Sequence, residues 1–117
     1  MEKHTRILVA DDHATSRRGL RALLATYPST EVICEATNGQ EAVCQVGAYQ
    51  PDVVLMDIRM PLLGGLEATR LIKNRWPEIK VIVLTLHAGC EADVRAAGAD
   101  VFLIKGCPTE DLLNAIQ

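Results

Sequence analysis

Four short apolar segments each end at a charged or hydroxyl residue, and this repeated pattern constrains the fold more than any other feature. The segments and the residues that follow them are 7–10 with Asp11 and Asp12, 53–56 with Asp57, 81–84 with Thr85, and 101–104 with Lys105. If the segments are neighbouring parallel strands, their carboxyl ends meet at one edge of a sheet. Three carboxylates, one hydroxyl and one ammonium group then converge there.

Composition narrows the class of protein. The chain has 117 residues, enough for one domain, and 49% of them are hydrophobic but only 3% aromatic, so the core is aliphatic. A net charge of −3 argues against a domain that itself binds nucleic acid. No apolar run approaches the roughly 18 residues that span a bilayer, and residues 1–6 lack the apolar stretch of a signal peptide. We expect a cytoplasmic protein without a membrane partner.

The cysteines show neither a C-x-x-C pair nor a zinc-binding spacing; they are Cys34, Cys44, Cys90 and Cys107. We interpret them as buried free thiols. A redox role for Cys107 is the alternative, because the cation of Lys105 lies two residues away and a nearby cation lowers a thiol pKa.

Apolar segments alternate with segments of helical period. We expect strands near 6–10, 31–36, 52–57, 80–85 and 100–104, and helices near 14–26, 39–47, 65–76, 89–97 and 108–116. Segments 53–56 and 81–84 are apolar at every position, as in strands buried on both faces. This pattern predicts a doubly wound α/β fold, a five-stranded parallel sheet of order 2-1-3-4-5. Segment 89–97 has only Val94 as a sizeable apolar residue, so its helix is the weakest.

The predicted cluster suits a divalent cation and a phosphoryl group. Two unit charges about 4 Å apart repel by roughly 4 kcal/mol near a protein surface, so three carboxylates need compensation. Lys105 supplies one positive charge, and Mg²⁺ fits the rest because it prefers oxygen ligands and keeps positions for water and phosphate. The chain has no His/Cys cluster of the kind that binds zinc or copper. We interpret His13 and His87, which lie near this edge, as bystanders.

Asp57 is the candidate nucleophile, because it ends a fully apolar strand and a carboxylate can form an acyl phosphate by in-line attack. The metal and Lys105 would stabilise the charge on the transferred group, and Thr85 would donate a hydrogen bond to it. Each residue also has a structural alternative. Asp11 can cap a helix, Lys105 can be a solvated charge, and for Thr85 a plain strand position is an equal interpretation.

Taken together, these residues resemble the receiver domain of bacterial two-component response regulators, over essentially the whole chain. The sequence of these stretches is most similar to the NarL/FixJ subgroup, whose members carry a LuxR-type helix-turn-helix effector domain after the receiver domain. The stretches that carry the resemblance are LVADDH at 8–13, DVVLMDIRMP at 52–61, VLTLH at 83–87 and GADVFLIK at 98–105. The resemblance implies a flavodoxin-like receiver fold over residues 1–117, with any C-terminal DNA-binding effector domain outside this chain.

The resemblance also assigns roles. Asp57 would accept a phosphoryl group from a sensor histidine kinase, with Thr85 and Lys105 contacting that group. Mg²⁺ would be held by Asp57, by Asp11 and Asp12, and by the backbone carbonyl of Arg59.

Thr85 and Phe102, which stands where the family often has a tyrosine, would carry the switch that changes an output surface. The expected function is phosphoacceptor signalling that controls transcription, not turnover of an external substrate.

Partners follow from the same resemblance. Arg17, Arg18 and Arg21 would form the surface that docks the kinase, although a merely solvated helix face explains them equally well. A homodimer through the first and last helices, or the last two, is a further hypothesis. This domain would bind no nucleic acid itself, and DNA would be reached through the missing effector domain.

One departure from the family keeps an alternative open. The segment from Thr85 to Lys105 is about two residues shorter than usual, and at about 100° per residue this loss shortens or turns the fourth helix. A receiver-like interaction module that works without phosphorylation is therefore the competing hypothesis. An aspartate-nucleophile phosphatase fits poorly, because Arg59 stands where a general acid is needed two residues after Asp57. A flavin carrier fits poorly too, because its phosphate loop would not begin with two acids.

Overall fold

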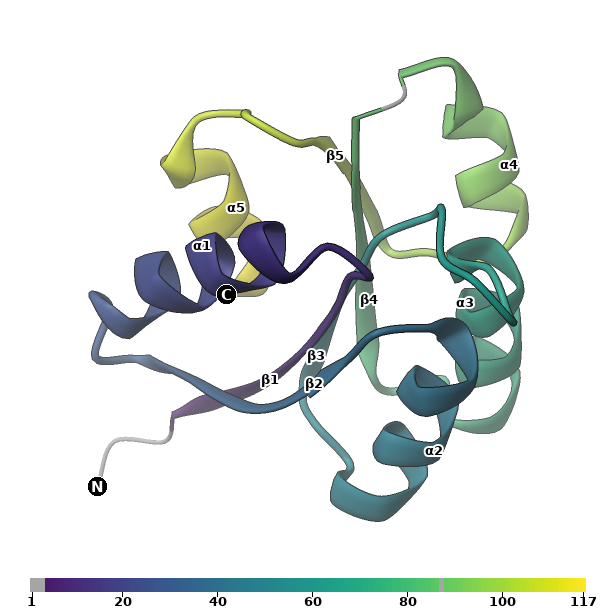
Figure 1. The fold of residues 1–117 in the computed structure, drawn as a ribbon, viewed down its shortest axis with the longest axis horizontal. Coiled ribbons are helices and arrows are strands. Elements are labelled where there is room, and N and C mark those ends of the chain that lie inside the picture. The colour runs from purple at the N-terminus through teal and green to yellow at the C-terminus, as the bar shows by residue number, and fades with distance from the viewer. Residues whose placement is uncertain (1–3, 87) are drawn as a thin grey trace.

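Strands and helices alternate along the described residues, 4–86 and 88–117, of a computed structural model (Figure 1). The strands are β1 (Thr5–Ala10), β2 (Thr30–Ala36), β3 (Val53–Met56), β4 (Lys80–Thr85) and β5 (Val101–Ile104). They form a five-stranded sheet of order β2-β1-β3-β4-β5, and every neighbouring pair is parallel. The predicted fold and strand order are therefore confirmed.

Helices cover both faces of this sheet. They are α1 (Ala14–Ala25), α2 (Gly39–Tyr49), α3 (Gly65–Arg75), α4 (Glu91–Ala96) and α5 (Thr109–Ile116). Helices α1 and α5 lie on one face, and α2, α3 and α4 lie on the other (Figure 1). None of the helices in the described part of the chain is both long enough and apolar enough to cross a bilayer.

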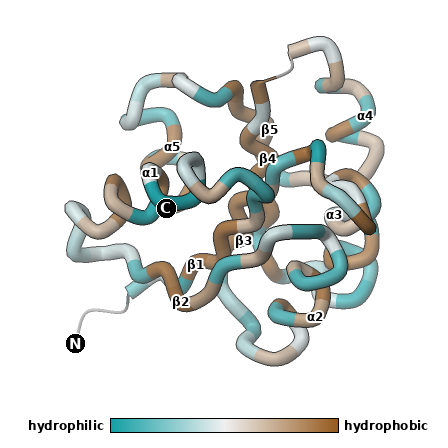
Figure 2. Tube along the Cα trace, in the orientation of Figure 1, coloured by the Kyte–Doolittle hydropathy of each residue, from teal (hydrophilic) through white to brown (hydrophobic). Residues whose placement is uncertain are grey.

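Alternation along each strand produces two separate cores. In β1, Ile7 and Val9 pack with Leu24 of α1, whereas Leu8 packs with Val46 of α2. Strands β3 and β4 are central, so almost every side chain along them is buried, as their continuous apolar sequences predicted. Figure 2 shows the same arrangement, with hydrophobic strands inside and hydrophilic segments toward the periphery.

The fourth helix is as short as the sequence predicted. A 3₁₀ turn (Ala88–Cys90) leads into α4, which has six residues and buries only Val94. An i,i+4 ion pair of 3.0 Å between Glu91 and Arg95 adds a solvent-exposed contact. Because a helix this short does not hold together alone, α4 depends on Val94 for its attachment to the sheet.

Candidate functional site

Two acids stand side by side where β1 and β3 end. Ala10 and Met56 are register partners in these strands, so the residues that follow them, Asp11 and Asp57, become neighbours. The backbone N–H of Asp57 donates to the carbonyl of Ala10 at 2.9 Å, and that of Asp11 donates to the carbonyl of Ala36 at 3.0 Å. Both acids are buried, with 1% and 8% of their surface exposed for Asp11 and Asp57. The sheet thus fixes two carboxylates in one crevice.

Lys105 joins the two acids. Its Nζ lies 2.8 Å from Oδ2 of Asp11 and 3.2 Å from Oδ2 of Asp57. Its backbone N–H donates to the carbonyl of Thr85 at 2.7 Å, which ties the end of β5 to the end of β4. The ammonium also donates to Oγ of Ser16 at 3.2 Å. No sequence motif pointed to Ser16; only its place in the first turn of α1, which packs at this edge, connects it with the site.

Burial and the Lys105 ammonium act on these acids with different results. Burial alone would raise the pKa of Asp11, but hydrogen bonds with Lys105, Ser16 and the N–H of His13 outweigh it, and the pKa lies below its usual value. For Asp57 burial prevails over the attraction of Lys105, and the charge of Asp11 adds to it, so the pKa is raised. Burial opposes the charge of Lys105, but Asp11 and Asp57 together hold its pKa above the usual value. Lys105 is therefore a cation, whereas the negative charge of Asp57 is disfavoured by burial and so destabilises the folded protein.

Asp12 completes the acidic group from a more exposed position. Its Oδ1 lies 3.0 Å from Nδ1 of His13. One ligand atom from each of Asp11, Asp12, His13 and Asp57 can be chosen so that all lie within 4.8 Å of one another. Three carboxylates in this small space suit a hard divalent cation such as Mg²⁺, whose compensating charge would relieve their repulsion.

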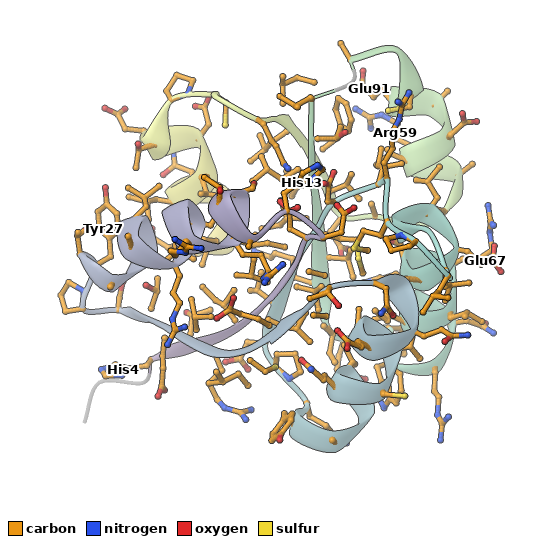
Figure 3. The ribbon with its side chains drawn as sticks, viewed as in Figure 1. His4, His13, Tyr27, Arg59, Glu67 and Glu91 are labelled. Carbon is orange, nitrogen blue, oxygen red and sulfur yellow. The ribbon has the colours of Figure 1, made fainter. Side chains whose placement is uncertain are left out.

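An open depression of about 580 Å³ lies above these groups. Its lining includes His13, Ser16, Asp57, Arg59, Leu86 and Lys105. Figure 3 shows His13 and Arg59 at this end of the sheet and His4 at the opposite end. The depression leaves room for a phosphoryl donor to approach Asp57.

The two residues expected to act as a switch occupy different environments. Thr85 is the last residue of β4, fully buried, at the same edge as the acids. Phe102 is half-buried in β5 and packs against the core beneath α2, α3 and α4, the cluster that includes Val94. The structure thus brings Thr85 to the site and places Phe102 on the core face that α4 covers.

The arginines predicted to form a docking surface differ in their contacts. Arg17 donates to the backbone carbonyl of Asp11 at 2.7 Å and to Oε1 of Glu35 at 3.2 Å. Arg21 pairs with the other oxygen of Glu35 at 2.9 Å, and Arg18 is exposed. Arg17 therefore holds the loop that carries Asp11, a role for which the sequence offered no signal.

The cysteine predictions need correction. Cys44 is exposed on α2, and the other three thiols are only partly buried, so the interpretation as buried thiols was wrong. Burial, followed by the charge of Asp111, raises the pKa of the Cys107 thiol. Lys105 directs its ammonium to the two acids instead, so the alternative, a Cys107 thiol activated by this cation, is not supported. His87, interpreted as a bystander, lies outside the described residues.

Comparison with known proteins agrees with this geometry. The profile of the response regulator receiver domain matches residues 7–117. Transcriptional regulatory protein DegU of Brevibacillus brevis is 38% identical over 118 residues, covering 99% of this chain and 50% of that protein. Response regulator UvrY of Escherichia coli (strain K12) is 41% identical over 115 residues, with coverages of 95% and 52%. The chain spans about half the length of the curated relatives it matches.

Solved structures show the same likeness. The response regulator domain of Thermotoga maritima CheB superimposes with a TM-score of 0.89 at 31% identity, covering 97% of this chain and 94% of that one. A two-component response regulator of the LuxR family from Aurantimonas sp. SI85-9A1 gives a TM-score of 0.90 at 33% identity, with coverages of 97% and 83%. The chain therefore belongs to the response regulator receiver domain family, in its LuxR-type branch.

Proposed function

We propose that Asp57 is the phosphoacceptor of this receiver domain and that a sensor histidine kinase phosphorylates it in the presence of Mg²⁺. The observation that carries the proposal is the Lys105 ammonium bridging Asp11 and Asp57 beneath an open depression. Such an arrangement holds a nucleophile in place and already contains one of the charges that a transferred phosphoryl group requires.

The chain's own residues perform the transfer as follows. A carboxylate oxygen of Asp57 attacks phosphorus in line, the new O–P bond forms, and the bond to the donor breaks with its electron pair leaving on the donor. Lys105 gives up its contact with Asp57 and donates to a phosphoryl oxygen.

Asp11, Asp12, Asp57 and the backbone carbonyl of Arg59 would hold Mg²⁺, and the bound ion would neutralise charge on the transferring group. Thr85 would donate a hydrogen bond from its hydroxyl group to a phosphoryl oxygen.

The new charge at Asp57 would drive the output. A phosphoryl group adds about −1.5 to −2 charges, and Thr85, as the last residue of β4, would draw the loop that follows it toward those charges. Phe102 and Val94 pack in the same cluster, so a shift of the loop reaches α4. In a longer regulator of the LuxR type this change would control transcription through an effector domain. The homodimer and the cytoplasmic location stay predictions.

A phosphorylation-independent interaction module is the second candidate function, and the six-residue α4 is the observation that favours it. A helix of only six residues offers a smaller surface for phosphorylation to change. Turnover of an external phosphate ester is not proposed, because Arg59, two residues after Asp57, offers a cation where such an enzyme needs a general acid.

Intact mass after incubation with Mg²⁺ and acetyl phosphate tests the proposal. Wild type and an Asp93→Asn control, altered at an exposed position of α4, should each gain about 80 Da, the mass of one phosphoryl group. Asp57→Asn should gain nothing. If wild type is folded and binds Mg²⁺ yet gains no mass, the phosphorylation-independent function replaces this one.

A further inference from the structure

We propose that His13 is a fourth side-chain ligand of the acidic site, beside Asp11, Asp12 and Asp57, and gives it a preference for a transition-metal dication over Mg²⁺. The inference rests on the proposed function, because it concerns the same acidic site. It assigns a role to a side chain that its sequence position alone did not distinguish from a bystander.

The spacing of the four groups carries the proposal. Nδ1 of His13 lies 3.0 Å from Oδ1 of Asp12 and 3.4 Å from Oδ1 of Asp11, and the set that includes Asp57 lies within 4.8 Å. An octahedral ion about 2.1 Å from each ligand separates adjacent ligand atoms by about 3.0 Å and opposite ones by about 4.2 Å. The two distances from Nδ1 of His13 match adjacent ligand positions, and the four atoms, all within 4.8 Å of one another, need only small side-chain movements to surround one ion.

The local backbone explains why the imidazole lies there. His13 is the N-cap of α1, and its side chain makes no capping hydrogen bond to the helix. Its backbone N–H instead donates to Oδ1 of Asp11 at 2.9 Å, which turns the residue toward the acids. The side chain is 70% exposed, so an ion can reach the imidazole from the solvent.

Ligand chemistry then predicts the preference. Carboxylates alone favour hard ions such as Mg²⁺, which also keep most of their water. Imidazole nitrogen adds little for Mg²⁺ but binds Co²⁺, Ni²⁺ and Zn²⁺ well. A site of three acids and one imidazole therefore holds a transition ion more tightly than the three acids would.

Calorimetric titration with Co²⁺ and with Mg²⁺ separates the two contributions. All proteins carry His87→Asn, so that the other imidazole predicted near this edge contributes nothing. Adding His13→Asn should weaken Co²⁺ binding about tenfold or more while changing Mg²⁺ binding less than about threefold. His4→Asn is the matched control, since His4 lies at the opposite end of the sheet (Figure 3), and it should change neither affinity.

Paramagnetic NMR of the Co²⁺ form reports ligation directly. A coordinated imidazole should give one strongly shifted exchangeable N–H proton, present with His4→Asn and absent with His13→Asn. Equal weakening of both ions, or no shifted imidazole proton, would overturn the proposal and leave His13 as a hydrogen-bond partner of Asp12. In that case Asp57 should still be labelled by acetyl phosphate with Mg²⁺. If the labelling itself fails, the proposed function is contradicted as well.

Discussion

Asp57 is held where its negative charge costs stability. Burial raises its pKa against the attraction of Lys105, and Asp11 adds to the rise. Because the folded pKa exceeds the unfolded one, the folded protein keeps this proton over a pH range in which the unfolded chain has lost it. The stability from this group is therefore full below the unfolded pKa and is lost as the pH rises through the folded pKa. The site gives up stability to hold an ionised nucleophile near neutral pH.

Asp57→Asn should accordingly be more stable than wild type at neutral pH, by about 1 kcal/mol, which raises the Tm by about 4 °C in a domain of this size. The difference should shrink as the pH falls through the raised pKa of the folded carboxyl, and should vanish below the unfolded value of about 4. Urea unfolding across this pH range measures it, with Asp93→Asn as the exposed control that should match wild type throughout. An Asn variant less stable at neutral pH would show that pairing with Lys105 outweighs burial.

The sequence predicted the acids but not their supports, for a physical reason. Asp11, Asp57 and Lys105 follow apolar strands, and in a parallel sheet the carboxyl ends of the strands meet at one edge whatever the side-chain details. The contacts of Arg17 with the Asp11 carbonyl and with Glu35 depend on how α1 packs against β2, which local sequence does not encode. The exposure of Cys44 likewise depends on which face of α2 meets the sheet.

At the scale of elements, the loop after β3 is fixed by close packing of backbone. Gly65 opens α3 and its N–H donates to the carbonyl of Ile58 at 2.8 Å. A Cβ at this position would collide with the backbone carbonyl of Asp57. The preceding Gly64 has room, because its Cβ would lie 3.5 Å from the carbonyl of Ile58, an ordinary contact.

Gly65→Ala should therefore displace Asp57, cost about 2 kcal/mol or more of stability, and slow labelling by acetyl phosphate. Gly64→Ala should change both quantities little. Urea unfolding and the rate of mass gain check the pair. If the two alanine variants have the same stability and the same labelling rate, the loop relaxes around the added methyl group and Gly65 does not position Asp57.

Helix α4 depends on a single anchor, whereas α2 is held by several buried residues along eleven positions. Val94→Ala should release α4 locally: amides 91–97 should exchange with solvent much faster while those of β4 keep their protection. Val46→Ala removes the same atoms from a fully buried position of α2, and should lower global stability by about 1 to 3 kcal/mol instead. Hydrogen exchange by mass spectrometry distinguishes these results. Loss of β4 protection in Val94→Ala would show that α4 unfolds only with the sheet.

At the scale of the whole molecule, the doubly wound sheet places the acidic site at one edge and the surface formed by α4, which phosphorylation would change, on one face. The acids lie at the switch point between β1 and β3, where the chain's winding direction reverses. Thr85 ends strand β4 at the same edge of the sheet, and α4 follows β4 along the chain on one face, while α1 lies on the other face. The elements followed from the sequence because each apolar segment is typical of a strand, whereas the strand order rested on the doubly wound fold that the family resemblance implies. The fourth helix could be predicted only as short, because its conformation depends on a single contact.

A partner that reaches the acids across α1 meets two arginines with different roles. Arg18 is exposed, so Arg18→Glu should slow phosphotransfer from the cognate kinase about tenfold by electrostatic repulsion, and leave labelling by acetyl phosphate unchanged. Arg17→Gln should slow both reactions, because it releases the backbone carbonyl of Asp11. Arg70→Glu, on α3 across the sheet, is the surface-charge control and should slow neither. Phosphotransfer time courses with the two donors decide the matter: if Arg18→Glu slows both equally, Arg18 acts on the site and not on the kinase.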